Sequence, residues 1–503
     1  MRFHRFARVT ALLLAVGALA ACSDKVPAAP GETPTPGVAS SSPTAGPGPR
    51  AALTWEPCAA KYECARLTVP LDYSGKVPGD IEIAITRLPA GDRDHRLGSL
   101  VVDPGGPGGS GVEYVQGQPR QFWGQLSDRF DIVGFDPRGA GESTPLDCVD
   151  DLDALYHPDP SPDTAAERQA LADVSRQFAR ACGEKGGRLL PFISAEPVAR
   201  DMDEIRKALG EAKLTYLGFS YGTYLGAMYA ELFPANVRAL VLDGPVDPTL
   251  KAEEWQKQQA VGFEEALQAF LADCAGNKSC AFYSNGAPGA AFDALMAKID
   301  AGPLPIAGEA RTLGPGEASL AVTGALYSRT SGWPRLARGL AAAQKGDGGL
   351  LMELSDGYLD RDKSGHYSNF MEIYRAVSCV DLAFPRDVAA YEALAADFVK
   401  VAPHFGAELA YEHLDCAFWP VPPAAPRTIR GKGAGPILVV GTTRDPATPY
   451  RWAEALSRQL EGAALLTREG DGHTAFGSSR CIQAAVETFL IDLKAPSAGT
   501  VCR

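Results

Sequence analysis

The 503-residue sequence has few basic residues, only seven histidines and no Cys-x-x-Cys pair. The 48 Lys and Arg residues are outnumbered by 61 Asp and Glu residues and do not cluster, which argues against a nucleic-acid partner. Zinc knuckles need closely spaced cysteines or histidines, so no metal site is expected, and no organic cofactor is implied. The formal charge of −13 mainly favours solubility.

Large-scale disorder is excluded by composition. Apolar residues make up 46% of the chain and aromatic residues 8%, as in ordinary globular proteins. A chain of this length forms one large domain with an insertion, or two domains.

The N-terminus carries the pattern of an export signal. Arg2, Arg5 and Arg8 precede Val9–Ala21, a run of thirteen apolar or small residues. As a helix this run spans about 20 Å, which is too short to cross a bilayer but typical of a secretory signal. Its Leu-Ala-Ala-Cys ending resembles a bacterial lipobox, which would make Cys22 the lipidated first residue. The alternative is an ordinary signal whose cut site adjoins a cysteine.

We therefore expect a lipoprotein signal peptide at residues 1–21, and the lipidated cysteine with a disordered tether at residues 22–50. Pro, Ser, Thr, Ala and Gly dominate the tether, which shows no apolar periodicity. The mature protein would be anchored to the outer face of the cell membrane through Cys22, with part of it released.

Cysteine usage agrees with an oxidising compartment. The eleven cysteines are an odd number, and setting Cys22 aside leaves ten that are neighbours along the chain. Because sequence does not fix connectivity, the pairing rests on proximity alone. The expected pairs are Cys58 with Cys64, Cys148 with Cys182, Cys274 with Cys280, Cys379 with Cys416, and Cys481 with Cys502.

Beyond the tether, short apolar runs alternate with helical patterns such as 198–209 and 222–232. This alternation predicts an α/β fold with a mostly parallel sheet flanked by helices. It stops at about 250–430, which we interpret as a large, mainly helical cap domain over the sheet edge where such folds bind ligands. The core would then comprise residues 51–249 and 431–503. The expected strands are 66–70, 81–87, 97–102, 130–136, 214–218, 238–242, 436–441 and 463–467.

A nucleophile motif follows one of these strands. Gly218-Phe-Ser220-Tyr-Gly222 occurs once, between an apolar strand and a helix. In such a tight strand-to-helix turn, side chains two residues to either side of the serine would collide, which explains the glycines. The turn exposes the hydroxyl and directs the following helix N-terminus at a developing oxyanion. Ser220 is therefore the predicted catalytic nucleophile.

A serine hydroxyl needs a base, and chain order selects it. His473 lies in the loop Asp471-Gly472-His473, beyond the last expected strand. The acid should follow a strand between serine and histidine, and Asp445 lies in the loop that leaves strand 436–441. The order Ser220, Asp445, His473 is that of the α/β-hydrolase fold, which we expect here.

An oxyanion hole needs two backbone N–H groups. One is that of Tyr221, and the other is expected in the glycine-rich loop Asp103–Gly111, with Gly106 as the donor. This loop could instead cradle phosphate, but it lacks the Gly-Lys-Ser/Thr ending of a P-loop and the Gly-x-Gly-x-x-Gly spacing. A further segment, Asp136–Ser143, is interpreted as a structural turn after a strand.

Together these segments resemble the secreted tripeptidyl aminopeptidases of actinobacteria, which are relatives of prolyl aminopeptidase. The resemblance runs from about Trp55 to Cys502, and its specific part is Pro-Gly-Gly-Pro-Gly, in which prolyl aminopeptidases carry His in place of Pro104. It implies removal of short peptides from free N-termini, with cap carboxylates holding the substrate ammonium. It also matches Cys379-Val-Asp381 to a Cys-x-Asp of the family, so Asp381 is the candidate ammonium ligand; a buried structural aspartate is the alternative. The matching segments are Val69–Tyr73, Asp103–Gly111, Gly134–Gly139, Gly218–Thr223 and the Asp445 and His473 loops.

Three functions are compatible with these residues. The first is a serine exopeptidase that releases short peptides, foremost tripeptides, through an acyl-enzyme. The second is a carboxylesterase or a prolyl aminopeptidase-like hydrolase with the same triad. The third is a catalytically idle binding lipoprotein, which the complete triad disfavours. Peptides with a free N-terminus are the expected substrates.

Overall fold

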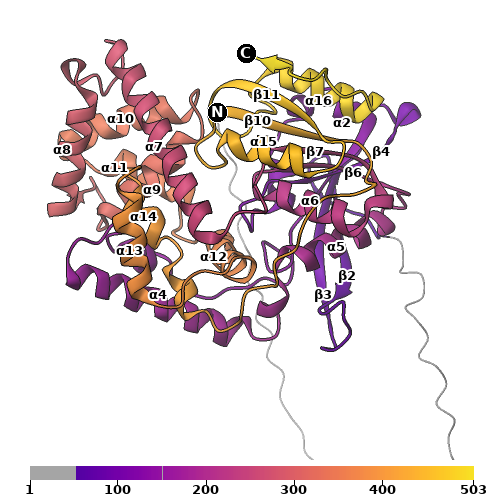
Figure 1. Ribbon diagram of the computed structural model, residues 1–503, viewed down its shortest axis with the longest axis horizontal. Helices are drawn as coiled ribbons and strands as arrows, with labels where there is room; N and C mark the ends of the chain where they lie inside the picture. The colour runs from indigo at the N-terminus through magenta and orange to yellow at the C-terminus, as the bar shows by residue number, and fades with distance from the viewer. Residues whose placement is uncertain (1–52, 150) are drawn as a thin grey trace, which may run out of the picture. The chain divides into compact units, whose positions relative to one another are not determined.

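One sheet of ten strands forms the centre of the chain. The computed structural model describes residues 53–149 and 151–503, so the predicted signal peptide, Cys22 and the tether lie outside the described residues. The strand order is β1-β2-β3-β5-β4-β6-β7-β10-β11-β12, and β8 and β9 form a separate pair (Figure 1). The strands are β1 (Glu56–Ala59), β2 (Tyr62–Pro70), β3 (Asp80–Leu88), β4 (Gly98–Asp103), β5 (Phe130–Phe135), β6 (Leu214–Phe219), β7 (Val237–Asp243), β8 (Leu304–Pro305), β9 (Thr312–Leu313), β10 (Ile437–Arg444), β11 (Ala464–Asp471) and β12 (Val501–Cys502).

The sheet is mostly parallel. The strands from β5 to β12 in this order pair in parallel, whereas β1, β2 and β3 are antiparallel. Every strand expected from the sequence is present, so the predicted mostly parallel α/β sheet is confirmed. The strands that were not expected, β1, β8, β9 and β12, have four residues or fewer, too short for an apolar pattern to show.

Helices cover both faces of the parallel strands, which explains why these strands are continuous apolar runs. All residues of β6 are buried. Alternate side chains go to opposite faces. Tyr216 joins the apolar core beneath α5 (Ala195–Ala208), α6 (Tyr221–Leu232) and α15 (Tyr450–Gln459). Leu217 joins the core beneath α1 (Gly111–Gly117), α2 (Leu126–Arg129) and α16 (Arg480–Asp492). Figure 1 shows α5 and α6 on one side of the sheet and α2 and α16 on the other.

The helices have the following bounds: α1 (Gly111–Gly117), α2 (Leu126–Arg129), α3 (Asp153–Tyr156), α4 (Ala165–Gly186), α5 (Ala195–Ala208), α6 (Tyr221–Leu232), α7 (Ala252–Gly276), α8 (Pro288–Ala301), α9 (Pro315–Leu326), α10 (Gly332–Gln344), α11 (Gly349–Tyr358), α12 (Phe370–Asp381), α13 (Val388–Phe398), α14 (Gly406–Tyr411), α15 (Tyr450–Gln459) and α16 (Arg480–Asp492). Across the described part of the chain, no helix is both long enough and apolar enough to span a bilayer.

A mainly helical insertion, α7 to α14, lies between β7 and β10 and forms the cap. Helices α7 to α11 gather together in Figure 1 around an apolar core that includes Phe270, Leu336 and Leu340. Helix α12 instead packs with the sheet, through Ile373 among others. Helix α4, which comes from between β5 and β6, packs against the short helix η6 (Leu414–Phe418). The cap is thus larger than the insertion alone, because a segment of the first core half joins it.

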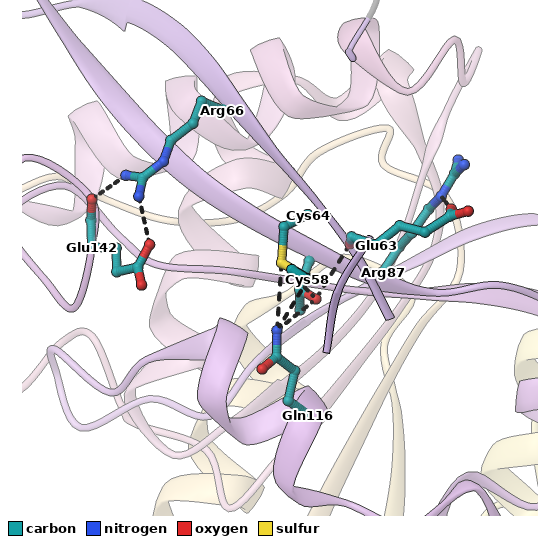
Figure 2. Close-up of a disulfide and its surroundings, with 8 residues drawn as sticks. Cys58, Glu63, Cys64, Arg66, Arg87, Gln116 and Glu142 are labelled. Carbon is teal, nitrogen blue, oxygen red and sulfur yellow. Dashed lines mark hydrogen bonds and ion pairs between the residues drawn. A yellow bond between two sulfur atoms is a disulfide. The ribbon is translucent and has the colours of Figure 1, made fainter. Parts of the chain in front are cut away.

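All five expected disulfides are formed. They join Cys58 to Cys64, Cys148 to Cys182, Cys274 to Cys280, Cys379 to Cys416, and Cys481 to Cys502. The first lies at one edge of the sheet, between β1 and β2, beside helix α1 (Figure 2). There Gln116 of α1 donates hydrogen bonds to Thr86 of β3 at 3.1 Å and to the Cys64 sulfur at 3.5 Å. The edge hairpin is thereby fastened to the helix that follows the glycine-rich loop.

The segment Asp136–Ser143 is a structural turn, as interpreted from the sequence. Arg138 is fully buried and forms an ion pair with Asp201 at 2.6 Å. Asp136 accepts hydrogen bonds from the Ser110 hydroxyl at 2.6 Å and from the Val112 amide at 3.1 Å. These bonds hold the start of α1, and with it the end of the glycine-rich loop.

Candidate active site

Ser220 lies at the turn between β6 and α6. Its backbone has φ 53° and ψ −125°, a combination that costs energy for any residue with a side chain. Gly218 and Gly222 touch across the turn, because a Cβ on Gly218 would lie 2.5 Å from the Gly222 carbonyl oxygen. The Ser220 amide donates to the Asp243 carbonyl at 2.9 Å, which ties the turn to β7. The geometry therefore requires both glycines of the motif.

The glycine-rich loop after β4 lies directly against this turn. Gly105 has a φ of 89°, and a Cβ on it would lie 2.8 Å from the Tyr221 nitrogen. Its own amide is engaged, since it donates to Asp103 at 2.8 Å. The next residue, Gly106, lines the same cavity as Ser220 and Tyr221. The structure thus brings Ser220 together with Gly106 and Tyr221, the two residues whose backbone N–H groups an oxyanion hole would use.

Asp445 and His473 form a hydrogen-bonded pair. His473 Nδ1 lies 2.8 Å from Asp445 Oδ1 and 3.0 Å from Oδ2. The carboxylate is itself held by the amides of Ala447 and Thr448, at 3.0 and 2.8 Å. His473 Nε2 is buried, and within the described chain it has no hydrogen-bond partner. With the Nδ1 proton directed to Asp445, Nε2 is the acceptor that a general base requires.

Asp243 connects the serine turn with the histidine loop. Its carboxylate accepts the amides of Ala475 and Phe476 at 3.0 and 2.7 Å, just after His473. Burial raises the pKa of Asp243 to about 6. Since its carbonyl also accepts the Ser220 amide, one residue fixes the positions of both predicted catalytic loops.

Ser220 and His473 line a cavity of about 590 Å³ between the core and the cap. This volume is in the range of sites for small molecules and short peptides. Aromatic residues are prominent in its wall. The aromatic residues are Tyr114, Tyr156, Phe219, Tyr221, Tyr224, Trp255, Phe263, Tyr327, Tyr358, Phe370, Tyr374, Phe384 and Tyr411.

Asp381 lies at the end of α12 and lines this cavity, but both of its oxygens are engaged. Oδ1 accepts the Ala195 amide at 3.0 Å, and Oδ2 accepts the Tyr221 hydroxyl. Burial raises its pKa to about 6. Asp381 thus anchors the side chain of Tyr221, the residue that follows the predicted nucleophile. Its role as an ammonium ligand stays a prediction.

Two further carboxylates, Glu408 and Glu412, lie one helical turn apart at α14 and also line the cavity. Glu412 Oε1 accepts the Tyr374 hydroxyl at 2.8 Å, whereas Oε2 is buried and accepts no hydrogen bond within the described chain. His413 Nε2 lies 3.7 Å from Oε2, but burial lowers the pKa of His413 to about 3, which favours the neutral imidazole. Burial raises the pKa of Glu408 to about 7 and also raises the pKa of Glu412. The spacing i, i+4 on one helix was a visible signal for a shared face, but sequence reasoning missed these residues.

Of the described residues that line the cavity, Arg375 is the only lysine or arginine. It forms an ion pair with Asp415 at 3.1 Å and also attracts the Glu412 carboxylate. The cavity therefore has more buried carboxyl groups than cationic groups. Asp415 also lies within metal-ligand distance of Cys379 and Cys416, but these cysteines are joined to each other as a disulfide and offer no thiolate.

Comparison with known proteins gives two family matches. Residues 98–287 match the model described as alpha/beta hydrolase fold, and residues 402–502 match the model described as TAP-like protein. The first match covers the glycine-rich loop and the serine turn, and the second covers Asp445 and His473.

Curated relatives match over nearly the full length. "Serine protease Hip1" of Mycobacterium tuberculosis is 37% identical over 90% of this chain and 91% of its own length. "Tripeptidyl aminopeptidase" of Streptomyces lividans is 34% identical over 90% of this chain and 87% of its own. "Carboxylesterase B" of M. tuberculosis is 37% identical over 87% of this chain and 86% of its own.

Proposed function

Since this chain belongs to the tripeptidyl aminopeptidase family of α/β-hydrolase serine peptidases, we propose that it is an exopeptidase that releases short peptides, foremost tripeptides, from free N-termini. The observation that carries the proposal is the cavity: the same walls hold Ser220, His473 and a buried carboxyl group, Glu412, one oxygen of which accepts no hydrogen bond within the described chain. A hydrolase of neutral acyl compounds has no use for such a group, because a buried carboxylate with an unfilled oxygen destabilises the free protein.

In the proposed reaction, the Ser220 hydroxyl attacks the carbonyl carbon of the scissile peptide bond. His473 Nε2 takes the hydroxyl proton, and Asp445 stabilises the imidazolium through Nδ1. The backbone N–H groups of Gly106 and Tyr221 hold the oxyanion of the tetrahedral intermediate. His473 then gives its proton to the leaving amine, and the peptide remains as an ester on Ser220. Water, deprotonated by His473, hydrolyses this ester and restores the serine.

Substrate selection is assigned to the cap, because the triad itself cleaves esters and amides alike. An N-terminal ammonium is a cation with three N–H donors. Glu412 Oε2 offers a buried acceptor without a hydrogen-bond donor in the described chain, and Glu408 lies one turn away. An ammonium bound between them forms charge-assisted hydrogen bonds and neutralises part of the excess negative charge. Such a bond at a fixed point of the cavity wall limits the number of residues that can reach Ser220.

The test is a panel of chromogenic amides with one, two and three residues, each with a free and an acetylated N-terminus. The proposal predicts the highest kcat/KM for a free tripeptidyl amide, and at least about thirtyfold less for its acetylated form, since leaving a buried charge unpaired costs about 2–5 kcal/mol. Equal values of kcat/KM for the free and acetylated tripeptides would reject the exopeptidase.

A carboxylesterase is the second candidate, favoured by the relative named "Carboxylesterase B". It uses the same Ser220, Asp445 and His473. The panel therefore includes simple aliphatic esters. An esterase hydrolyses these with kcat/KM far above that of any peptidyl amide, and acetylation of the amides has no effect.

We also propose that the protein is an exported lipoprotein attached through Cys22, although this residue lies outside the described part of the chain. The support is the N-terminal sequence pattern, together with five disulfides, which form in oxidising compartments. Two acyl chains on one cysteine give stable anchoring where a single chain does not. Wild-type protein should fractionate with membranes, and Cys22→Ser should be released or fail to mature. Wild-type protein that is wholly soluble and begins after Cys22 would contradict the anchor.

A further inference from the structure

The cap contacts the loop of the predicted catalytic base through the turn that joins α9 to α10. The His473 amide donates to the carbonyl of Tyr327 at 2.9 Å. The Tyr327 ring stands edge-on to the imidazole, with the ring centres 5.1 Å apart. Both the backbone and the side chain of His473 therefore rest on a residue of the cap.

Gly472 makes this contact possible. It has a φ of 110°, and a Cβ at this position would lie 2.9 Å from the Tyr327 carbonyl oxygen. Any side chain here would strain the backbone and push the cap turn away from the histidine. Contact with the cap, and not with the core, therefore explains why a glycine precedes His473.

An ion-pair bridge fastens the same turn to the core. Arg329 contacts Asp471 at the end of β11 and Asp273 of α7, each at 2.8 Å. Asp471 is almost fully buried and also pairs with Arg444, the residue before the predicted acid. The bridge therefore connects two cap elements to the strand end that carries His473.

Helix α7 makes the equivalent contact with the loop of the acid. A Cβ on Gly262 would lie 2.5 Å from the Pro446 carbonyl oxygen, so helix and loop are in direct contact. Gln259 donates to the Ala447 carbonyl at 2.9 Å. The amide of Ala447 in turn donates to the Asp445 carboxylate. Figure 1 shows α7 between the other cap helices and strands β10 and β11.

We propose that the cap is a positioning element of the catalytic machinery: α7 and the α9–α10 turn hold the loops of Asp445 and His473 in the geometry that proton transfer needs. A cap that only covers the site would need contacts with substrate, but not these contacts behind the base and the acid. The inference rests on the triad alone and does not depend on whether the substrate is a peptide or an ester. Misplacement of a catalytic group by about 1 Å can cost about a hundredfold in rate, so small shifts in these loops would be measurable.

The test uses Arg329→Gln and a small activated ester, p-nitrophenyl acetate, which needs no binding site in the cap. We expect kcat to fall about tenfold and KM to change less than about twofold. A tenfold loss is larger than the effect of a typical surface ion pair and smaller than the loss of about a hundredfold from a catalytic group misplaced by about 1 Å. Arg335→Gln is the matched control, because Arg335 is equally exposed and its partner Glu353 lies within the cap. It should retain kcat within about twofold. Arg329→Lys keeps the charge and should recover part of the loss.

Two further measurements separate positioning from stability. The downfield proton resonance of the His473–Asp445 hydrogen bond should shift or broaden in Arg329→Gln but not in Arg335→Gln. Gln259→Ala should lower kcat on the ester in the same way, whereas Gln268→Ala, which removes a hydrogen bond within α7, should not. A variant that lowers the melting temperature but leaves kcat and this resonance unchanged would show a purely structural contact. Equal kcat for Arg329→Gln and Arg335→Gln would overturn the proposal.

Discussion

Glu412→Gln separates recognition of the substrate amine from catalysis. The two side chains have the same shape, and the glutamine oxygen can still accept the bond from the Tyr374 hydroxyl. The substitution removes the negative charge at Oε2, which is buried and accepts no hydrogen bond within the described chain. We expect kcat/KM for a free tripeptidyl amide to fall, and kcat/KM for the acetylated amide and for a small ester to remain unchanged.

The magnitude follows from the surroundings of the group. Removing one partner of a buried, hydrogen-bonded charge pair costs about 2–5 kcal/mol, which corresponds to a loss of roughly thirtyfold to several-thousandfold in kcat/KM. Glu408 remains one turn away and retains part of the attraction, so the lower end of this range is expected. Arg375 keeps its ion pair with Asp415 but loses the attraction of Glu412.

The free enzyme should not lose stability. Burial raises the pKa of Glu412, so its carboxyl contributes most to stability below its unfolded pKa of about 4.3, and this contribution is lost as pH rises through the folded pKa. At neutral pH, Glu412→Gln should therefore leave the thermal midpoint of the ligand-free protein unchanged or higher, measured by scanning calorimetry.

The assay compares free and acetylated tripeptidyl amides, with Asp381→Asn as the matched control. Both oxygens of Asp381 already hold the Ala195 amide and the Tyr221 hydroxyl. Asp381→Asn should therefore change kcat/KM for the free and the acetylated amide by the same factor. If Asp381→Asn, but not Glu412→Gln, lost the preference for the free over the acetylated amide, Asp381 would be the ammonium ligand. Full discrimination in both variants would refute the reasoning from unmatched charge.

Three other outcomes are expected. Ser220→Ala should fold normally and lose about a million-fold in kcat; more than a few per cent residual activity in purified variant would exclude Ser220 as nucleophile. The ratio of kcat/KM for free over acetylated amide should fall as pH drops from about 8 to about 5, because protonation of Glu408, with a pKa raised to about 7, and of Glu412 removes the negative charge. Effects of pH on the acyl transfer itself are common to both amides and cancel in the ratio. A ratio that does not change with pH would show that Glu408 and Glu412 do not bind the substrate ammonium. Replacing Cys379 and Cys416 by serine opens a loop with a sequence separation of 37 and should cost about 3–4 kcal/mol on the chain-entropy model, measured by denaturant unfolding; an unchanged midpoint would contradict it.

The core and its catalytic loops could be predicted because their signals are local. Buried parallel strands are continuous apolar runs, and the turn at Ser220 requires glycines at fixed spacing. Chain order then selected Asp445 and His473 among many acids and seven histidines. The disulfides could be paired by proximity because the longest sequence separation is 37.

The cavity walls could not be predicted in the same way, because they depend on contacts between distant segments. Nothing near Glu412 in the sequence indicates that one of its oxygens is buried and, within the described chain, accepts no hydrogen bond. The contact of His473 with Tyr327 uses a backbone carbonyl, which any residue provides. Asp381 was selected by resemblance, but its bonds to Ala195 and Tyr221 exist only in the folded chain.

The insertion of the cap between β7 and β10 also determines when in synthesis the enzyme becomes complete. The turn with Ser220 is synthesised before the cap, whereas Asp445 and His473 follow β10 and β11 and are synthesised after the whole cap. A partly synthesised chain that ends within the cap therefore carries Ser220 without Asp445 or His473. Each disulfide meanwhile joins cysteines that emerge close together, so oxidation can proceed in step with emergence of the chain. The order of elements along the chain thus delays proteolytic activity until the last strands are in place, with no need for a removable inhibitory segment.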